Sequence, residues 1–80
     1  MDTDQYITAL GNAFRSRREK LDMTHEDVAE AADLNVNYYA RIERGEVNTS
    51  IKKLVIISKA LDTELSKLAA VAEQKIKTKR

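Results

Sequence analysis

The most informative part of the sequence is Thr24–Gly45, which reads THEDVAEAADLNVNYYARIERG. Thr24 and Asp27 have the spacing of a capping box, which marks the start of a helix. Asn35 is a favourable N-cap for a second helix. Gly45 supplies the residue type for which the left-handed backbone at a helix end costs least. The stretch therefore predicts two short helices joined by a tight turn.

Apolar residues within this stretch indicate which side of each helix points inward. Val28, Ala29 and Ala32 lie on one side of the first helix. Tyr39 and Ile42 are three residues apart, so they share the inner side of the second helix. The layout is that of a helix-turn-helix, a motif whose second helix can lie in the major groove of DNA.

The composition favours an all-helical bundle that forms a single domain. The chain has 80 residues, no proline, two glycines and only 5% aromatic residues, so turn-formers and strand-formers are scarce. A chain of this length, with 42% hydrophobic and 34% charged residues, has room for one modest core. We expect residues 1–80 to be one compact all-α domain.

Three further helices are expected around the central motif, which gives five in total. They span about residues 3–21, 51–62 and 64–77, and the helix-turn-helix occupies about 24–45. Thr49 or Ser50 is expected to cap the helix over 51–62. The residues expected to face inward from that helix are Ile51, Leu54, Ile57, Ser58 and Leu61.

The charge of the chain is unevenly distributed. The net charge is +1, but residues 22–46 carry seven acidic and two basic groups, a balance of −5. Residues 47–80 carry eight basic and three acidic groups, a balance of +5. The acidic centre argues against indiscriminate phosphate binding. It also supports an alternative function, that of an antitoxin or adaptor whose acidic surface meets a protein partner.

Several other classes of protein are excluded by what the sequence lacks. There is no cysteine, no signal peptide and no run of membrane-spanning length, which together favour a cytoplasmic protein. His25 is the only histidine, and no cluster of ligands or nucleophile accompanies it. We therefore expect no metal, no cofactor and no enzymatic activity.

Four segments together resemble the Cro and lambda-repressor-like family of helix-turn-helix regulators, the XRE type. They are FRSRREKLDMT (14–24), HEDVAEAADL (25–34), NVNYYARIERG (35–45) and IKKLVIISKALDTELSKL (51–68). Asp22 and Asp33 stand where the family usually has glycine, and His25 stands where it commonly has glutamine. Aspartate tolerates left-handed backbone better than most residues, so the turns can persist. The small size is similar to restriction–modification controller proteins, and the resemblance implies a homodimeric transcriptional regulator that binds a palindromic double-stranded DNA operator.

Candidate base contacts lie on the outward side of the predicted recognition helix. They are Asn35, Val36, Asn37, Ala40 and Arg41. Asn37 could form a bidentate bond to adenine and Arg41 to guanine, while the apolar members could touch a thymine methyl. The alternative is an ordinary solvated helix face, and the helix-turn-helix frame favours DNA contact.

Candidate phosphate contacts come from the start of the first motif helix and from the region after the second. They are Thr24, His25, Tyr38, Arg44, Asn48, Thr49 and Ser50. Helix N-termini offer free backbone N–H groups to phosphate. For Thr24 and Ser50 the alternative is a capping role alone, and for Tyr38 it is packing against the turn.

Arg18 falls on or beside the apolar stripe of the first helix. We expect it to pair inside the domain with Glu43, because a buried arginine requires a carboxylate. The alternative is that its long stem reaches out to water.

The last predicted helix is a candidate for the dimer interface. Its expected interface residues are Leu68, Val71, Ala72 and Ile76. Leu65 and Leu68 are the better candidates to seal the monomer, which would leave Val71, Ala72 and Ile76 facing water unless a partner covers them. The alternative is a frayed amphipathic tail, which the basic ending KIKTKR would suit.

Overall fold

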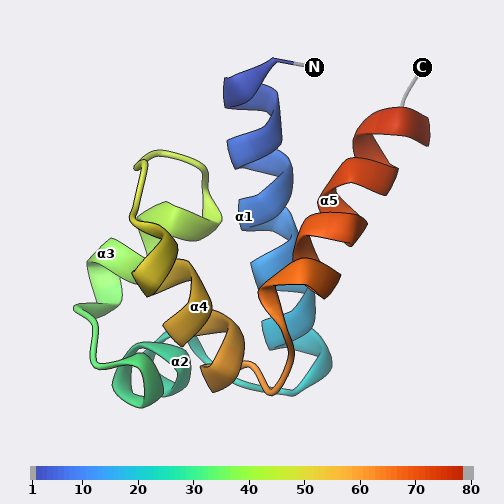
Figure 1. Ribbon diagram of the computed structural model, residues 1–80. Helices are drawn as coiled ribbons and strands as arrows, with labels where there is room; N and C mark the ends of the chain where they lie inside the picture. Colours follow the sequence, from blue (N-terminus) through green and yellow to red (C-terminus); the bar gives the residue numbers. More distant parts are fainter. Residues whose placement is uncertain (1, 79–80) are drawn as a thin grey trace.

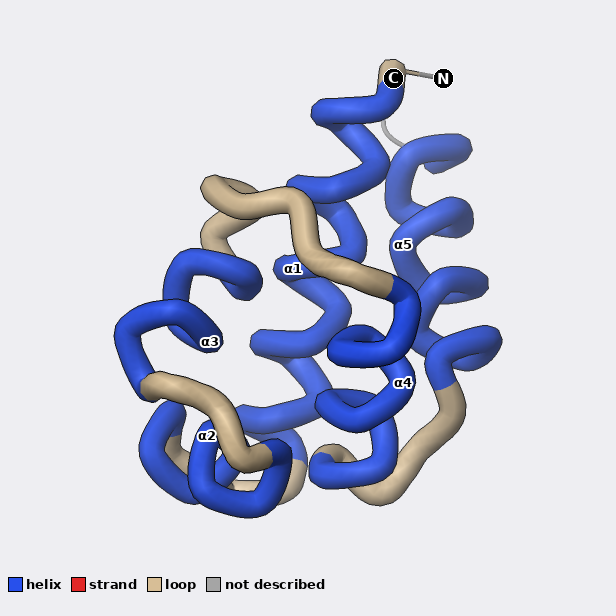
Figure 2. The backbone as a smooth tube through the Cα atoms, turned by 60° about the vertical axis from the view of Figure 1, so that its left-hand side comes forward, coloured by secondary structure: helices blue, strands red, loops and turns tan. Residues whose placement is uncertain are grey.

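Five α-helices and no strand make up residues 2–78, the part of the chain that the computed structural model describes (Figures 1 and 2). They are α1 (Thr3–Lys20), α2 (His25–Ala32), α3 (Val36–Glu43), α4 (Ile51–Ala60) and α5 (Leu65–Thr78). The Cα radius of gyration of 11.7 Å is about that expected of a compact domain of this length. The prediction of a compact five-helix all-α fold is confirmed.

Hydrogen bonds at the helix starts follow the sequence signals. Thr24 and Asp27 form the capping box, with bonds of 3.0 and 2.8 Å between each side chain and the other's backbone N–H. Asn35 Oδ1 accepts two backbone N–H groups at the start of α3. Ser50, rather than Thr49, caps α4 through its hydroxyl oxygen. These local bonds fix where α2, α3 and α4 begin.

Three aspartates and one glycine hold the left-handed turns that separate the helices. Asp22 has φ of 59°, Asp33 56° and Asp62 54°, while Gly45 has 72°. The turns therefore form at Asp22 and Asp33 without glycine, as aspartate's tolerance of this backbone allows. The same turn conformation recurs at Asp62, after which α5 begins at Leu65, one residue later than expected.

The core lies where α1 meets the other helices. The chain runs up α5 alongside α1 and antiparallel to it, and α3 also packs on α1 (Figure 1). α2 and α4 pack on each other, with α2 also against α3 and α4 also against α5. Its largest fully buried apolar side chains are Tyr39, Phe14, Ile57, Leu61 and Val28. No helix within residues 2–78 is both long enough and apolar enough to cross a bilayer.

Two burial predictions are wrong. Ile51 was expected to face the core, but it is 69% exposed. It is the first residue of α4 and projects beyond the packed core. Ala72 was expected to face water, but it is fully buried, as is Leu68 at 4% exposure. These two residues, one helical turn apart, form the seam along which α5 lies on α1, so neither offers surface to a partner.

Part of the α5 surface remains open. Val71 is 45% exposed and Ile76 is half-buried. The helix continues through Lys75 to Thr78, so that part of the basic ending is helical, and its last two residues lie outside the described part of the chain.

Candidate nucleic-acid interface

α3 has one buried side and one exposed side. Tyr39, Ile42 and Glu43 are 0%, 4% and 3% exposed, whereas Asn37 and Arg41 are exposed on the opposite side. The helix is therefore held by one face and free to meet a ligand with the other. This is the arrangement that a recognition helix requires.

The five candidate base contacts differ in their exposure and in how far other contacts already occupy their side chains. Asn37 and Arg41 are exposed, and among residues 2–78 the carboxylate within 4.0 Å of Arg41 is that of Glu46, at 3.7 Å. An exposed pair at that distance contributes little, so Arg41 remains available. Val36 and Ala40 are half-buried. Asn35 has already committed its side-chain oxygen to the cap, so only its amide group is free.

The candidate phosphate contacts at the start of α2 are not equivalent. The Thr24 hydroxyl accepts the capping bond, which leaves backbone groups as its means of contact. His25 has a side chain 41% exposed, and its Nε2 lies 3.0 Å from Glu43 Oε1. The ring also meets Tyr39 edge-on, with 6.1 Å between centroids. No local pattern in the sequence indicates that His25 joins α2 to the end of α3.

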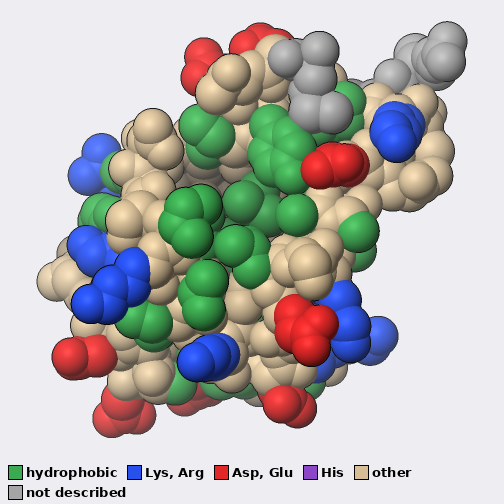
Figure 3. All heavy atoms as spheres, in the orientation of Figure 1, with side chains coloured by type: hydrophobic (Ala, Val, Ile, Leu, Met, Phe, Trp, Pro, Cys, Tyr) green, Lys and Arg blue, Asp and Glu red, His purple; other side chains and the backbone are tan. Residues whose placement is uncertain are grey.

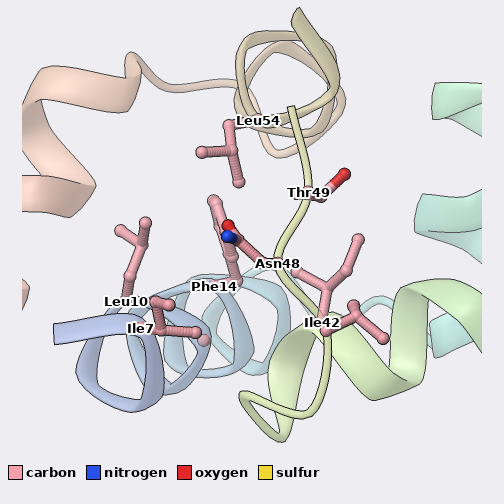
Figure 4. A pocket seen from close by; sticks show the side chains of 9 residues that line it. Ile7, Leu10, Phe14, Ile42, Asn48, Thr49 and Leu54 are labelled. Carbon is pink, nitrogen blue, oxygen red and sulfur yellow. The ribbon is translucent and has the colours of Figure 1, made fainter. Parts of the chain in front are cut away.

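The remaining phosphate candidates surround the segment between α3 and α4. The Tyr38 hydroxyl donates to Thr49 Oγ1 at 2.8 Å, which is the packing role considered as the alternative for this tyrosine. Arg44 is paired with Glu46, with Nε 2.8 Å from Oε2. Figure 4 shows the Asn48 side chain directed toward Phe14 and Leu54, over a small apolar pocket. Ser50 caps α4, as described above.

A buried ion pair anchors the end of α3 to α1. Arg18 Nε lies 2.7 Å from Glu43 Oε2, and Nη2 lies 3.2 Å from Oε1. Arg18 Nη1 also donates to the Met23 carbonyl at 3.0 Å. Burial would raise the pKa of Glu43, but hydrogen bonding and charge from Arg18 outweigh it and hold that pKa below its usual value. The contact expected from the sequence is thus present, with His25 as a third member.

A direct contact between main chains lies beside this ion pair. A Cβ atom placed on Gly11 would lie 2.5 Å from the Glu43 carbonyl oxygen and 2.6 Å from that of Ile42. A Cβ on Gly45 would lie 2.9 Å from Thr8 Cα. Both glycines of the chain therefore allow the end of α3 to rest on the backbone of α1. Gly11 was missed in the sequence, because nothing local to α1 signals which backbone will approach it.

An apolar surface lies away from α3. Ile51 and Val55, one turn apart on α4, are 69% and 38% exposed. Figure 3 shows hydrophobic side chains grouped on this face, over α4 and the adjoining parts of α1 and α5. Within residues 2–78, no three His, Cys, Asp or Glu side chains are arranged to hold a metal ion. Two surfaces are therefore available for binding a partner: the polar exposed face of α3 and the apolar patch on α4.

Comparison with known proteins gives consistent matches. Residues 14–68 match the helix-turn-helix family. The control protein C.MunI of Mycoplasma sp. is 38% identical over 66 residues, which cover 81% of this chain and 89% of that protein. The control protein C.SmaI of Serratia marcescens is 36% identical over 59 residues, covering 74% of this chain and 70% of that protein.

The fold also has a solved counterpart. The restriction–modification controller protein C.Esp1396I, crystallised as a tetramer in complex with its natural 35 base-pair operator, superposes with a TM-score of 0.83. The two sequences are 26% identical, and the match covers 91% of this chain and 96% of that one. With the exposed side of α3 and the family match over residues 14–68, these likenesses show that the chain belongs to the XRE-type helix-turn-helix family of DNA-binding transcriptional regulators.

Proposed function

We propose that this chain, as a single DNA-binding domain over residues 1–80, regulates transcription by binding a palindromic operator as a homodimer. The observation that carries the proposal is the division of α3 into a buried side and an exposed side bearing Asn37 and Arg41. The likeness to control proteins, and to a controller protein crystallised on its operator, supports it.

In this proposal, α3 reads base edges in the major groove. Asn37 and Arg41 are four residues apart, so their side chains lie one above the other on the exposed side. Asn37 can donate to and accept from adenine, and the Arg41 guanidinium matches the two acceptors of guanine. Val36 and Ala40 keep enough exposure for apolar contact with a thymine methyl, and Asn35 contributes its free amide.

Phosphate groups are bound from both ends of α3. Thr24 and His25, at the start of α2, lie near its C-terminal end, where His25 contacts Glu43. Thr49 lies near its N-terminal end, where it bonds to Tyr38. Ser50 follows, with Asn48 and Arg44 as weaker candidates because of their present contacts. These contacts fix the register of the helix and carry no sequence information.

We place the dimer interface on the apolar surface of α4, centred on Ile51 and Val55. A second copy is the occupant that a two-fold operator requires, since one symmetric contact covers the same patch on both chains. A palindromic operator requires the two recognition helices to lie about 34 Å apart, which is one turn of DNA. Val71 and Ile76 on α5 are secondary candidates, because their neighbours Leu68 and Ala72 are consumed by packing on α1.

Two measurements test the proposal. Binding to a duplex selected from a random pool should exceed binding to unselected duplexes by about 10³-fold or more, and equal affinity for both would contradict sequence-specific recognition.

Sedimentation of the intact chain should show a concentration-dependent dimer that Ile51→Glu weakens more than the matched substitution Ile76→Glu. A chain that stays monomeric on the operator would contradict the homodimer.

A further inference from the structure

Three side chains from three segments meet beside the start of α3. The Tyr38 hydroxyl donates to Thr49 Oγ1 at 2.8 Å, which ties the helix to the following loop. The ammonium group of Lys53, on α4, lies 4.9 Å from the centroid of the Tyr38 ring. An ammonium group at that distance over an aromatic face is attracted by the ring's electron density. Tyr38 therefore restrains a side chain that would otherwise move freely on its four-carbon stem.

Lys53 differs from the arginines around α3, because within residues 2–78 it has no acidic partner. Arg41 and Arg44 both face Glu46, at 3.7 and 2.8 Å. Lys53 is exposed and has no carboxylate within 4.0 Å among residues 2–78. Its charge is thus available to an external anion, in a position that an aromatic contact defines.

We propose that Lys53 binds a phosphate of the DNA backbone and that Tyr38 is the residue that positions it. The inference rests on the proposed function, because it requires α3 to enter the major groove. The groove is flanked on both sides by phosphates. Tyr38 directly follows the base-reading candidate Asn37, so the Lys53 ammonium lies beside the N-terminal end of α3, opposite to the end that His25 contacts.

The chemistry of this contact predicts its effect on binding. An ammonium group is a compact point charge that pairs with any phosphate, whatever the base. Lys53 should therefore strengthen binding to all duplexes equally, and should release one counterion on binding. The Tyr38 ring is the part that positions Lys53, while its hydroxyl is bonded to Thr49 in the loop.

Lys53→Gln tests the proposal, with Lys59→Gln as the matched control. Lys59 is also an exposed lysine of α4, but it lies in the last turn, away from α3. Binding to the selected operator and to a random duplex is measured between 50 and 200 mM salt. Lys53→Gln should make the plot of log affinity against log salt less steep by about one unit of slope. Its loss of affinity relative to the intact chain should therefore shrink about three- to fourfold between 50 and 200 mM salt, on both duplexes. Lys59→Gln should keep the wild-type slope.

Substitutions of Tyr38 test the positioning role. Tyr38→Phe keeps the ring beneath Lys53 and should keep the wild-type salt slope, whereas Tyr38→Leu removes the ring and should weaken binding. Tyr38→Leu should lower DNA affinity by a certain factor when Lys53 is present. In the Lys53→Gln background, that factor should be at most half as large. Equal losses in both backgrounds would overturn the positioning role.

The outcomes separate this inference from the proposed function. If the intact chain prefers the selected operator and Lys53→Gln matches Lys59→Gln, the inference fails while the proposed function stands. If the intact chain shows no binding to either duplex, both fail. Unchanged thermal unfolding of Lys53→Gln would exclude loss of folding as the cause of weaker binding.

Discussion

The two sides of α3 differ in how completely the rest of the chain determines them. On the inner side, Ile42 is packed, and Glu43 has bonds to Arg18 and His25. On the outer side, the side chains of Asn37 and Arg41 form no hydrogen bond to another described residue, and Arg41 only approaches Glu46, at 3.7 Å. One short helix thus carries its stabilising contacts on the inner face and its proposed recognition residues on the outer face. Substitutions on the two sides should therefore affect different measurements.

Breaking the buried ion pair should have the largest effect. Arg18→Met leaves the Glu43 carboxylate buried without its main partner, and Glu43→Gln does the same to the Arg18 charge. Each should lower the free energy of unfolding by about 3–5 kcal/mol, measured by urea denaturation followed by circular dichroism. The double variant should lose much less than the sum. Purely additive losses would show that the two residues are not energetically coupled.

Gly11→Ala should be the next most damaging change to the inner side. Alanine would favour the helix by about 1 kcal/mol on propensity alone. The new Cβ would meet the Glu43 carbonyl oxygen at 2.5 Å, and a backbone atom cannot swing aside. We expect a net loss of about 1–3 kcal/mol in the free energy of unfolding. Ser16→Ala, at an exposed position of α1, is the control and should not destabilise the fold.

Arg41→Ala probes the outer side. It should cost about 1–3 kcal/mol of binding free energy on the preferred operator and relax base preference at one position. Thermal unfolding should be unchanged, because Arg41 is exposed. Arg15→Ala, at an exposed arginine of α1 paired with Glu19, controls for loss of one charge. Equal weakening on every sequence would reassign Arg41 to the phosphate backbone.

Acid should weaken the inner side through Glu43. Its pKa in the folded state lies below the ordinary value of 4.5, so the unfolded chain binds the proton more readily. The stabilisation is complete above that ordinary value and is lost as pH falls through the folded pKa. This one group can contribute a slope of at most about 1.4 kcal/mol per pH unit. Urea denaturation of wild type and Glu43→Gln between pH 3 and 7 should show a shallower slope for the variant, which has no carboxyl at this position. Parallel slopes would contradict the assignment.

The smallest effect is expected at Tyr39, whose hydroxyl is the buried side-chain polar atom without a partner among residues 2–78. Its hydroxyl is buried without a hydrogen bond of ordinary geometry to any described residue, and burial, followed by the nearby Glu43 carboxylate, raises its pKa. Tyr39→Phe removes that hydroxyl and should leave the free energy of unfolding unchanged, or raise it by up to about 1 kcal/mol. A clear loss of stability would show that the hydroxyl has a partner, such as an ordered water.

Much of the inner side could be predicted because its signals are local. The capping box, the cap at Asn35 and the inward spacing of Tyr39 and Ile42 each depend on residues within one helical turn. The pairing of Arg18 with Glu43 was also predictable, since a charge on an apolar stripe has few alternatives. The helix starts and the inner face of α3 could therefore be predicted from the sequence.

Other features were not predictable because they depend on how helices meet. The burial of Ala72 depends on the angle at which α5 lies along α1, which no spacing within α5 reveals. The contact of Lys53 with Tyr38 joins residues fifteen positions apart, and the contact of His25 with Glu43 joins residues eighteen positions apart. The base and phosphate assignments remain predictions from position on α3 and around it.

The contact of the α3 main chain with the α1 main chain at Gly11 has a consequence for altering what the protein recognises. Because main-chain atoms hold the end of α3 against α1, the position and tilt of α3 should not change when its outward side chains are exchanged. The packed residues of its inner side can then stay as they are. If Asn37 and Arg41 read bases as proposed, positions 37 and 41 are where substitutions should change the preferred operator. A library randomised at these two residues, with positions 11 and 45 kept as glycine, should consist mainly of folded proteins that differ in the DNA they select.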